Sequence, residues 1–199
     1  MDYEAIAEKV MKRIFIELEA SGRHAHVTQA QAIALFGHPL TPTRPLSQPG
    51  QYLANARVTV VGPKGELAGV AVLGPERPEG QVELSMTDAR TLGISAPVRL
   101  SGDIEGTPGV TLLGEKGKVV LAKGAIVAQR HIHITPEDAK AMQVADKQVV
   151  RLQVYTGRPL VFDDVVVRVS PKFQTYVHLD YDEANACGYQ AGDLGRILQ

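Results

Sequence analysis

Apolar and polar residues alternate along much of this chain, and the alternation predicts short β-strands. In residues 13–20 every even-numbered position is apolar, and most of the positions between them are charged. Side chains two residues apart face the same side of a strand, so this segment is predicted to be a half-buried strand. Residues 2–12 carry apolar side chains at helical spacing among charges, which predicts a short amphipathic helix before the strand. A single helix over residues 2–19 is the alternative.

The remaining strands are predicted from runs rich in Val, Leu and Ile, separated by Gly- and Pro-rich turns. They are residues 57–61, 67–73, 81–85, 97–99, 110–113, 119–121, 149–155, 160–162, 165–169 and 176–179. Short helices are predicted at residues 29–37, 87–90, 136–142 and 182–186. The third of these helices begins after Thr135, a suitable N-cap, with Pro136 at its first position. Residues 38–51 hold four prolines and predict an irregular, largely extended loop. We therefore expect a mainly β fold of the α+β kind, with barrel-like sheets capped by short helices.

The composition is that of an ordinary globular protein, and it narrows the function classes. Hydrophobic residues make up 44% and charged residues 22% of the 199 residues, enough for one large domain or two small ones. The net charge of −1 gives no basic surface, and no apolar run approaches the ~20 residues of a membrane span, so neither nucleic acid nor a membrane is expected as a partner. A single cysteine, Cys187, allows no internal disulfide, and the cytoplasm is the expected location.

The candidate chemistry is concentrated in two histidine pairs. His131 and His133 lie in the segment RHIHIT, where a predicted strand meets a predicted helix. Histidines two residues apart on a strand point to the same face, with Cα atoms roughly 7 Å apart, so both imidazoles can bind one cation. His24 and His26 lie in the similar segment RHAHVT, which also precedes a predicted helix. Two such pairs among six histidines predict two metal sites; surface histidines bonded to loops are the alternative.

An internal repeat supplies a third ligand for each pair. Residues 82–84 (VEL) align with residues 177–179 (VHL), and the Asp-Ala and Gly that follow align with Glu-Ala and Gly. This register places Glu83 where the second half has His178. The predicted ligand sets are therefore His24, His26 and Glu83, and His131, His133 and His178. Three protein ligands leave a coordination position open, as in catalytic sites, and ligands without thiolate suit Zn²⁺, with Co²⁺, Ni²⁺ or Fe²⁺ as alternatives.

Other residues around these motifs are assigned supporting roles. Arg77 lies in a Gly- and Pro-rich loop six residues before the carboxylate ligand, and a guanidinium there favours a phosphate or carboxylate substrate. An exposed loop arginine is the alternative. Arg23 and Arg130 directly precede the histidine pairs, and by strand alternation their side chains face away from the ligands. We expect them to form structural ion pairs or to hold the ligand residues in place without binding a metal. Cys187 is expected to be a packing residue and His38 a loop histidine.

Six segments together resemble the PduL-like phosphotransacylases, a family of phosphate propanoyltransferases. They cover nearly the whole chain, and the two histidine motifs and the DEANA segment are the most specific. The matching segments are RHAHVT (23–28), LSQPGQ (46–51), VLGPERPEGQVELS (72–85), LGISAPVRLSGDI (92–104), RHIHITPEDA (130–139) and VHLDYDEANA (177–186). The resemblance implies acyl transfer between coenzyme A and inorganic phosphate, giving an acyl phosphate.

The resemblance also implies two metal ions, usually zinc. One would be held by the first ligand set with the CoA sulfur as fourth ligand, and the other by the second set with water. Arg77 falls where the family binds phosphate. Tyr181 and Gly80 stand where the family commonly has Thr, but neither departure removes a ligand.

The family fold implied for this chain is a pair of β-barrels related by the repeat. The first domain would be residues 1–20 plus 129–199, and the second residues 21–128. Family members often work inside bacterial microcompartments, so the expected location is the bacterial cytoplasm, within such a compartment. Residues 1–12 are either a short encapsulation helix that contacts shell or core proteins or a helix packed on the barrel. A homo-oligomer is left open.

The expected reaction is direct acyl transfer in a ternary complex. Phosphate is already an anionic nucleophile, and the sequence offers no Ser or Cys for a covalent intermediate. A metal-dependent hydrolase could use the same ligand sets, with a metal-bound hydroxide as nucleophile. A non-catalytic, microcompartment-associated binding protein is the other alternative. Acetyl and propanoyl groups are not distinguished by the sequence.

Overall fold

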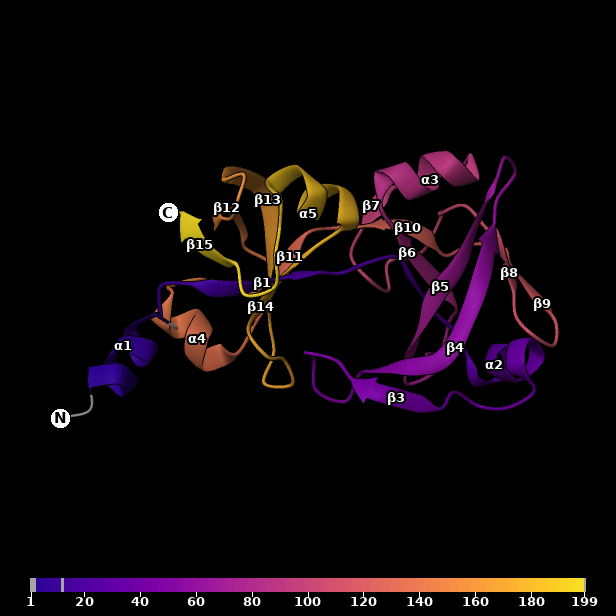
Figure 1. The fold of residues 1–199 in the computed structure, drawn as a ribbon, viewed down its shortest axis with the longest axis horizontal. Coiled ribbons are helices and arrows are strands. Elements are labelled where there is room, and N and C mark those ends of the chain that lie inside the picture. Colours follow the sequence, from indigo (N-terminus) through magenta and orange to yellow (C-terminus); the bar gives the residue numbers. More distant parts are fainter. Residues whose placement is uncertain (1–2, 12, 199) are drawn as a thin grey trace. The chain divides into compact units, whose positions relative to one another are not determined.

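The expected mainly β architecture is confirmed by a computed structural model, in which short helices follow several of the strands (Figure 1). The structure describes residues 3–11 and 13–198. By its internal contacts the chain divides into two units. Residues 1–21 together with 130–199 form unit 1, and residues 22–129 form unit 2. No helix within the described ranges is long and apolar enough to cross a membrane.

Unit 1 is a closed barrel in which the N-terminal strand joins strands of the C-terminal half. In order around the barrel the strands are β1 (Ile16–Ala20), β14 (Tyr176–Leu179), β11 (His131–Ile134), β13 (Leu160–Val169), β12 (Val149–Tyr155) and β15 (Leu194–Leu198). Alternate side chains fill the barrel, among them Ile16, Ile132, Leu152 and Val167. Helix α1 (Tyr3–Met11) precedes β1, so a helix followed by a strand is confirmed over the single long helix.

Unit 2 is a curled sheet of nine strands. The path through it is β7 (Val98–Arg99), β10 (Ala125–Ala128), β6 (Gln81–Leu84), β2 (His24–His26), β5 (Glu66–Gly74), β4 (Tyr52–Val61), β8 (Val110–Leu113) and β9 (Lys118–Leu121), with β3 (Pro42–Pro45) paired to β4. Small and branched side chains such as Ala25, Val72, Val82 and Leu112 fill its core. On β2 and β6 the core side chains Ala25 and Val82 alternate with buried polar ones, so the other face of these two strands is polar.

A helix follows each strand that carries a predicted metal ligand. α2 (Gln29–Phe36) follows β2, α3 (Met86–Leu92) follows β6, α4 (Pro136–Ala141) follows β11, and α5 (Tyr181–Cys187) follows β14. Each helix begins after a residue whose side-chain oxygen accepts the backbone N–H three positions on. These N-cap residues are Thr28, Ser85, Thr135 and Asp180. The caps turn the chain at the same point in every case, directly after the ligands.

The strands that lead into the two histidine pairs are exchanged between the units. β1 precedes β2 in the sequence, yet it pairs in parallel with β14 of unit 1. β10 precedes β11, yet it pairs in parallel with β6 of unit 2. The internal repeat is visible in the remaining pairing, because β2 lies antiparallel to β6 as β11 lies antiparallel to β14.

Two strands differ from the sequence prediction because proline and aspartate, which are rare in strands, interrupt their pattern. The proline-rich residues 38–51 contain β3, which pairs with β4 along one edge only, where missing N–H groups are tolerated. β13 is one strand, where the sequence predicts two separated by Asp163 and Asp164. Asp164 has a left-handed φ of 54°, and the two aspartates face the single residue Arg151 on β12. The interruption is therefore a β-bulge within a continuous strand.

The strand that closes the barrel, β15, is absent from the sequence prediction. Its sequence LGRIL contains Gly195, which weakens a strand pattern. A Cβ added at Gly195 would lie 3.1 Å from side-chain atoms of both Leu152 and Leu18. Glycine is present because the backbone of β15 passes directly over the packed core, a requirement that local sequence does not reveal.

Candidate metal centres

His24, His26 and Glu83 lie on one face of two neighbouring strands in unit 2. β2 runs antiparallel to β6, and the register places His24 directly opposite Glu83. Ala25, between the two histidines, and Val82, directly before Glu83, point into the core. The two histidines and the carboxylate therefore share the opposite face, and all three are buried. The structure brings the first predicted ligand set together.

The spacing of these ligand atoms suits a cation better than direct hydrogen bonds. His24 Nε2 lies 3.5 Å and His26 Nε2 lies 3.6 Å from Glu83 Oε1. Hydrogen bonds from nitrogen to oxygen are about 2.7–3.2 Å long. Two ligands of a tetrahedral Zn²⁺, bound at about 2.0–2.1 Å, lie about 3.3–3.4 Å apart. The three residues thus fit a tetrahedral cation that keeps a fourth position for another ligand.

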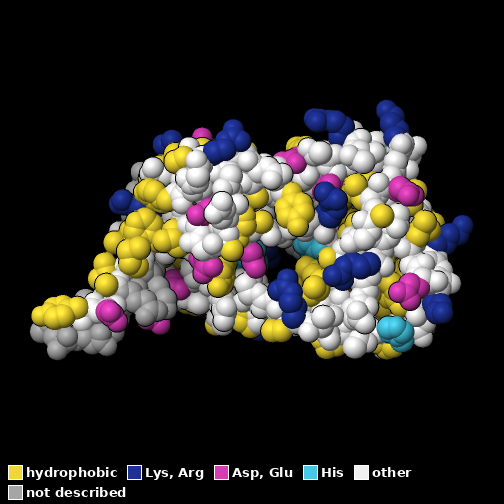
Figure 2. Space-filling model, viewed as in Figure 1, with side chains coloured by type: hydrophobic (Ala, Val, Ile, Leu, Met, Phe, Trp, Pro, Cys, Tyr) yellow, Lys and Arg dark blue, Asp and Glu magenta, His cyan; other side chains and the backbone are white. Residues whose placement is uncertain are grey.

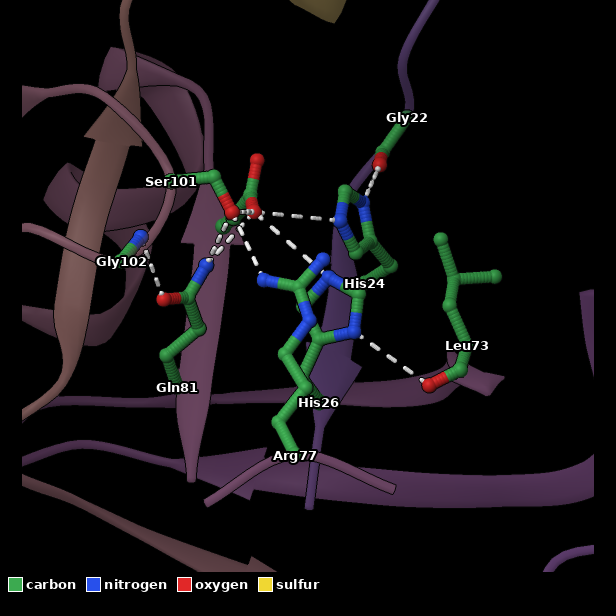
Figure 3. Close-up of polar contacts among 9 residues, drawn as sticks. Gly22, His24, His26, Leu73, Arg77, Gln81, Ser101 and Gly102 are labelled. Atoms are coloured by element: carbon green, nitrogen blue, oxygen red, sulfur yellow. Dashed lines mark hydrogen bonds and ion pairs between the residues drawn. The ribbon is translucent and has the colours of Figure 1, made fainter. Parts of the chain in front are cut away.

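The far side of each imidazole ring is anchored by a backbone carbonyl (Figure 3). His24 Nδ1 lies 2.8 Å from the Gly22 oxygen, and His26 Nδ1 lies 3.3 Å from the Leu73 oxygen. A carbonyl oxygen only accepts hydrogen bonds, so Nδ1 carries the proton in both rings. The lone pair of each neutral ring is then on Nε2, the atom that faces Glu83, which is the arrangement typical of metal-binding histidines.

Burial and charge together set the protonation of this cluster. Burial acts to lower the pKa of His24, but the Glu83 carboxylate and the Gly22 carbonyl outweigh it and raise that pKa. Burial lowers the pKa of His26 to about 4, against the opposing effect of Glu83. Burial acts to raise the pKa of Glu83, but the two histidines hold it well below its usual range. Glu83 is an ionised carboxylate and His26 a neutral imidazole near neutral pH, the forms that bind metals.

A hydrogen-bond network connects the Glu83 carboxylate to Arg77 (Figure 3). The Ser101 hydroxyl donates to Glu83 Oε1 at 2.6 Å and accepts from Arg77 Nη1 at 2.8 Å. The Gln81 amide nitrogen donates to the same Glu83 oxygen at 2.6 Å and to Ser101 Oγ at 2.8 Å. The positive charge of Arg77 also acts to lower the pKa of both histidines. The structure therefore places Arg77 beside the first ligand set.

The second ligand set forms the corresponding cluster in unit 1. β11 and β14 are antiparallel, with His131 directly opposite His178. His133 Nδ1 lies 3.1 Å from His178 Nε2, and one nitrogen from each of the three rings falls within a group no wider than 4.8 Å. Ile132 and Val177 point into the barrel, so the three buried histidines share its outer face. This set too could hold one cation and leave a coordination position open.

Neighbouring side chains hold the rings of the second set in place. Glu19 lies beside His178 in the β1–β14 register, and its Oε2 is 3.3 Å from His178 Nδ1. A carboxylate at Nδ1 favours the proton there and leaves the Nε2 lone pair for a metal. The Phe173 ring stacks on His133 with centroids 4.0 Å apart, and Arg168 lies 5.7 Å from the centroid of Phe173.

The predicted ion pairs of Arg23 and Arg130 are confirmed. Arg23 Nε lies 3.0 Å from Asp88 Oδ1, and Arg130 Nη1 lies 2.8 Å from Glu183 Oε1. Asp88 and Glu183 occupy the same place in the capping boxes of α3 and α5. Each arginine thus ties a histidine-bearing strand to the helix that follows the third ligand.

Cys187 and His38 take the roles expected of them. Cys187 is fully buried in the barrel core of unit 1, as a packing residue. His38 is exposed, and its Nδ1 lies 2.7 Å from the Pro39 carbonyl oxygen. His38 is therefore a loop histidine.

Tyr181 and Gly80 lie outside the two candidate ligand sets. Tyr181 is the first residue of α5 and is 44% exposed. At Gly80 an added Cβ would lie 2.5 Å from the side-chain oxygen of Gln31 and 2.9 Å from a methyl carbon of Leu121. Those two side chains occupy the space that a larger residue at position 80 would need.

Sequence reasoning missed Gln81 and Ser101 as site residues. Gln81 precedes Glu83 by two positions on the same strand, so the period-two rule places both on one face. That signal was available in the sequence. Ser101 comes from a turn 18 residues beyond Glu83, and no local pattern links the two positions.

Comparison with known proteins identifies the class of enzyme. A family model described as phosphate propanoyltransferase matches residues 17–190. A "Phosphate propanoyltransferase" of Enterococcus faecalis is 56% identical over 98% of this chain and 96% of its own length. A protein of the same name from Clostridioides difficile is 52% identical over 98% of this chain and 95% of its own length. Another, from Thermotoga maritima, is 50% identical over 90% of this chain and 87% of its own length. These matches define a transferase. The chain belongs to the phosphate propanoyltransferase family.

Proposed function

We propose that this enzyme transfers a short acyl group, propanoyl or acetyl, reversibly between coenzyme A and inorganic phosphate. The names of the relatives support phosphate as the acyl acceptor. The observation that carries the proposal is the pair of three-ligand clusters, each built from an H-x-H strand and its antiparallel neighbour. We propose one divalent cation, Zn²⁺ by preference, in each cluster, with both serving the same reaction.

The residues assigned to the metals are His24, His26 and Glu83 in unit 2 and His131, His133 and His178 in unit 1. Cations held there would supply Lewis-acid stabilisation to the departing CoA thiolate and to the thioester carbonyl. In the transfer, a phosphate oxygen forms a bond to the carbonyl carbon while the carbon–sulfur bond breaks and the thiolate leaves. The protein's own part is to orient the reactants and keep Glu83 ionised.

Arg77 is proposed to hold the phosphate for attack. A guanidinium pairs with phosphate through parallel N–H···O bonds, which fix orientation as well as position. The bond from Arg77 Nη1 to Ser101, which in turn donates to Glu83, orients the guanidinium relative to the first ligand set. This is a positioning contribution to the rate.

Direct transfer without an acyl-enzyme is proposed. Phosphate is an adequate nucleophile, and the one cysteine of the chain is fully buried in an apolar core. Burial raises the pKa of the Cys187 thiol, which disfavours the reactive thiolate. Ping-pong kinetics with an isolable acyl-enzyme would contradict this part of the proposal.

We propose the bacterial cytoplasm, inside a microcompartment, as the place of action. α1 would then contact shell or core proteins. Its described apolar side chains support this, since Tyr3, Val10 and Met11 are 75%, 50% and 43% exposed. Figure 2 shows yellow hydrophobic atoms on the surface at this end of the chain.

The test combines metal analysis with a CoA-release assay. The full chain is purified, its divalent metals are counted, and CoA release from acetyl-CoA, propanoyl-CoA and longer acyl-CoAs is measured with and without phosphate. We expect one metal ion for each of the two clusters and release that requires phosphate. Thioester loss without phosphate would identify a metal-dependent hydrolase instead. Absence of both metal and CoA binding would identify a non-catalytic binding protein.

A further inference from the structure

Gln81 is a buried polar residue that neither the ligand sets nor the proposed reaction explains. It is 2% exposed and lies on β6, two residues before Glu83 and opposite His26. Burying an amide is costly unless its polar atoms are hydrogen-bonded. Both ends of this amide are hydrogen-bonded, to Glu83 of the first candidate metal centre and to Ser101 and Gly102 in the turn beside it.

The backbone fixes which way the amide of Gln81 points. Its oxygen lies 2.9 Å from the backbone nitrogen of Gly102, an N–H that can only donate. The amide nitrogen must therefore face the other way, toward Glu83 Oε1 at 2.6 Å and Ser101 Oγ at 2.8 Å. Figure 3 shows the amide between Gly102 on one side and Ser101 on the other. Two N–H donors on one nitrogen suffice for both contacts.

We infer that Gln81 is a positioning residue that holds the Glu83 carboxylate in its metal-binding orientation. The bond from its amide fixes the carboxylate oxygen that faces His24 Nε2 and His26 Nε2. Its hydrogen bonds to Ser101 and Gly102 also hold the turn that contains these two residues. The Ser101 hydroxyl in that turn donates to Glu83 and accepts from Arg77. The inference rests on the proposed function, since it assumes a metal held by Glu83. Partners of this kind typically contribute about 10- to 100-fold to metal affinity.

Unit 1 provides an internal control for this role. The position equivalent to Gln81 is Tyr176, which lies two residues before His178 and opposite His133. The second ligand set has no carboxylate to be oriented by an amide, so a change at Gln81 should leave the second metal unaffected.

The experiment compares Gln81→Met and Gln81→Glu with the wild type, using the full chain loaded with Zn²⁺. Gln81→Met keeps the volume and removes both hydrogen-bonding ends. Gln81→Glu keeps an acceptor for Gly102 but turns a second carboxylate oxygen toward Glu83 and Ser101. Release of each Zn²⁺ to a chromophoric chelator is followed, and the visible spectrum of the Co²⁺-loaded proteins reports which site has changed. Thermal unfolding of the metal-free proteins checks that each variant is folded.

Both variants should lose one metal about 10- to 100-fold more readily than the wild type and keep the other unchanged. Wild-type retention of both metals by a folded Gln81→Met would overturn the inference. Wild-type retention of both metals by Gln81→Glu would also overturn it, because the bond to Gly102, which this variant keeps, would then be sufficient for metal binding. A wild type that binds fewer metals than the two clusters provide would instead contradict the proposed function. The two failures are therefore distinguishable.

Discussion

His26 shows at the scale of one residue how a buried histidine becomes a ready metal ligand. Burial lowers its pKa to about 4, so the ring is neutral throughout the physiological range. The Leu73 carbonyl at Nδ1 then directs the lone pair to Nε2. His24 differs, because the nearby Glu83 charge raises its pKa despite burial. A metal ion bound by this cluster would displace a proton from His24 more often than from His26.

Arg77→Ala should mainly damage the use of phosphate. The guanidinium is proposed to hold phosphate, and its removal leaves the three proposed metal ligands of unit 2 in place. We expect the KM for phosphate to rise on the order of tenfold or more, equivalent to about 1.4 kcal/mol, with metal content unchanged. Steady-state kinetics over a phosphate series measures this. Arg90→Ala, at an exposed position in the last turn of α3, is the control. An unchanged phosphate dependence in Arg77→Ala would refute the assigned role.

Asp180→Asn should stabilise the metal-free protein above pH 6. Burial raises the pKa of the Asp180 carboxyl to about 6, with the Glu183 and Asp182 charges adding to the effect and backbone N–H groups opposing it. A carboxyl pKa raised by folding gives stability that is complete below the unfolded pKa and is lost as pH rises through the folded value. Asparagine keeps an N-cap oxygen for the Glu183 N–H and carries no charge.

The gain from Asp180→Asn should be absent near pH 4 and reach about 1 kcal/mol at pH 8, allowing for solvent screening. Urea unfolding of both proteins at several pH values measures it. A stability difference that does not vary with pH would show that the buried charge is not its source.

At the scale of elements, the same arrangement of two strands and a helix occurs twice. In each ligand set a strand with two histidines lies antiparallel to a strand with the third ligand, and a capped helix follows. An arginine before the histidines pairs with the third residue of that helix, Arg23 with Asp88 and Arg130 with Glu183. The repeat fixes the position of strand ends, and with it the position of the ligands.

Glu19→Gln on β1 should weaken the second metal site alone. The Glu19 carboxylate faces His178 Nδ1 at 3.3 Å and strengthens the ring as a ligand through its negative charge. The amide keeps the shape but lacks the charge, so we expect about a tenfold loss of metal affinity in unit 1. Competition with a chelator measures the metal affinity of each site, and the visible spectrum of the Co²⁺-loaded protein shows which site has lost its metal. Glu17→Gln, an exposed change on the same strand, is the matched control. Equal loss of both metals in Glu19→Gln would contradict the expectation.

The clustering of the two candidate ligand sets could be predicted from sequence because their pattern is local and repeated. The H-x-H spacing identifies two strand faces, and the repeat supplies Glu83 and His178. Ser101 could not be predicted, since it reaches Glu83 through a turn that only the folded sheet positions. β15 was hidden for a related reason: Gly195 is selected by the close approach of Leu18 and Leu152, which are far from it in the sequence.

At the scale of the whole molecule, unit 1 is assembled from both ends of the chain. β1 is held between β14 and β15, so the barrel closes only when the last strand is present. This follows from the strand exchange, because β1 leads into the histidine pair of unit 2 while its pairing partners lie in unit 1. The domain bounds expected from sequence, 1–20 with 129–199 and 21–128, stay a prediction that limited proteolysis can test.

Deletion of residues 1–11 should leave catalysis and stability unchanged. The described apolar side chains of α1 are largely exposed, and among the residues whose burial is described the first in the barrel core is Ile16. These described side chains bury little surface, and neither ligand set lies near α1 in sequence. We expect kcat/KM within a factor of about two of the full chain, which corresponds to less than about 0.5 kcal/mol, and a matching Tm.

The same deletion should abolish delivery to a microcompartment if α1 is the segment that contacts shell or core proteins. Residues 1–15 fused to a fluorescent protein should then be sufficient for co-purification with compartments, and a fusion with Val10 and Met11 changed to Ser is the control. The exposed apolar side chains give the physical reason, because a helix recognised by a partner presents them to that partner. A deletion that leaves targeting intact but lowers Tm would instead assign α1 to packing on the barrel.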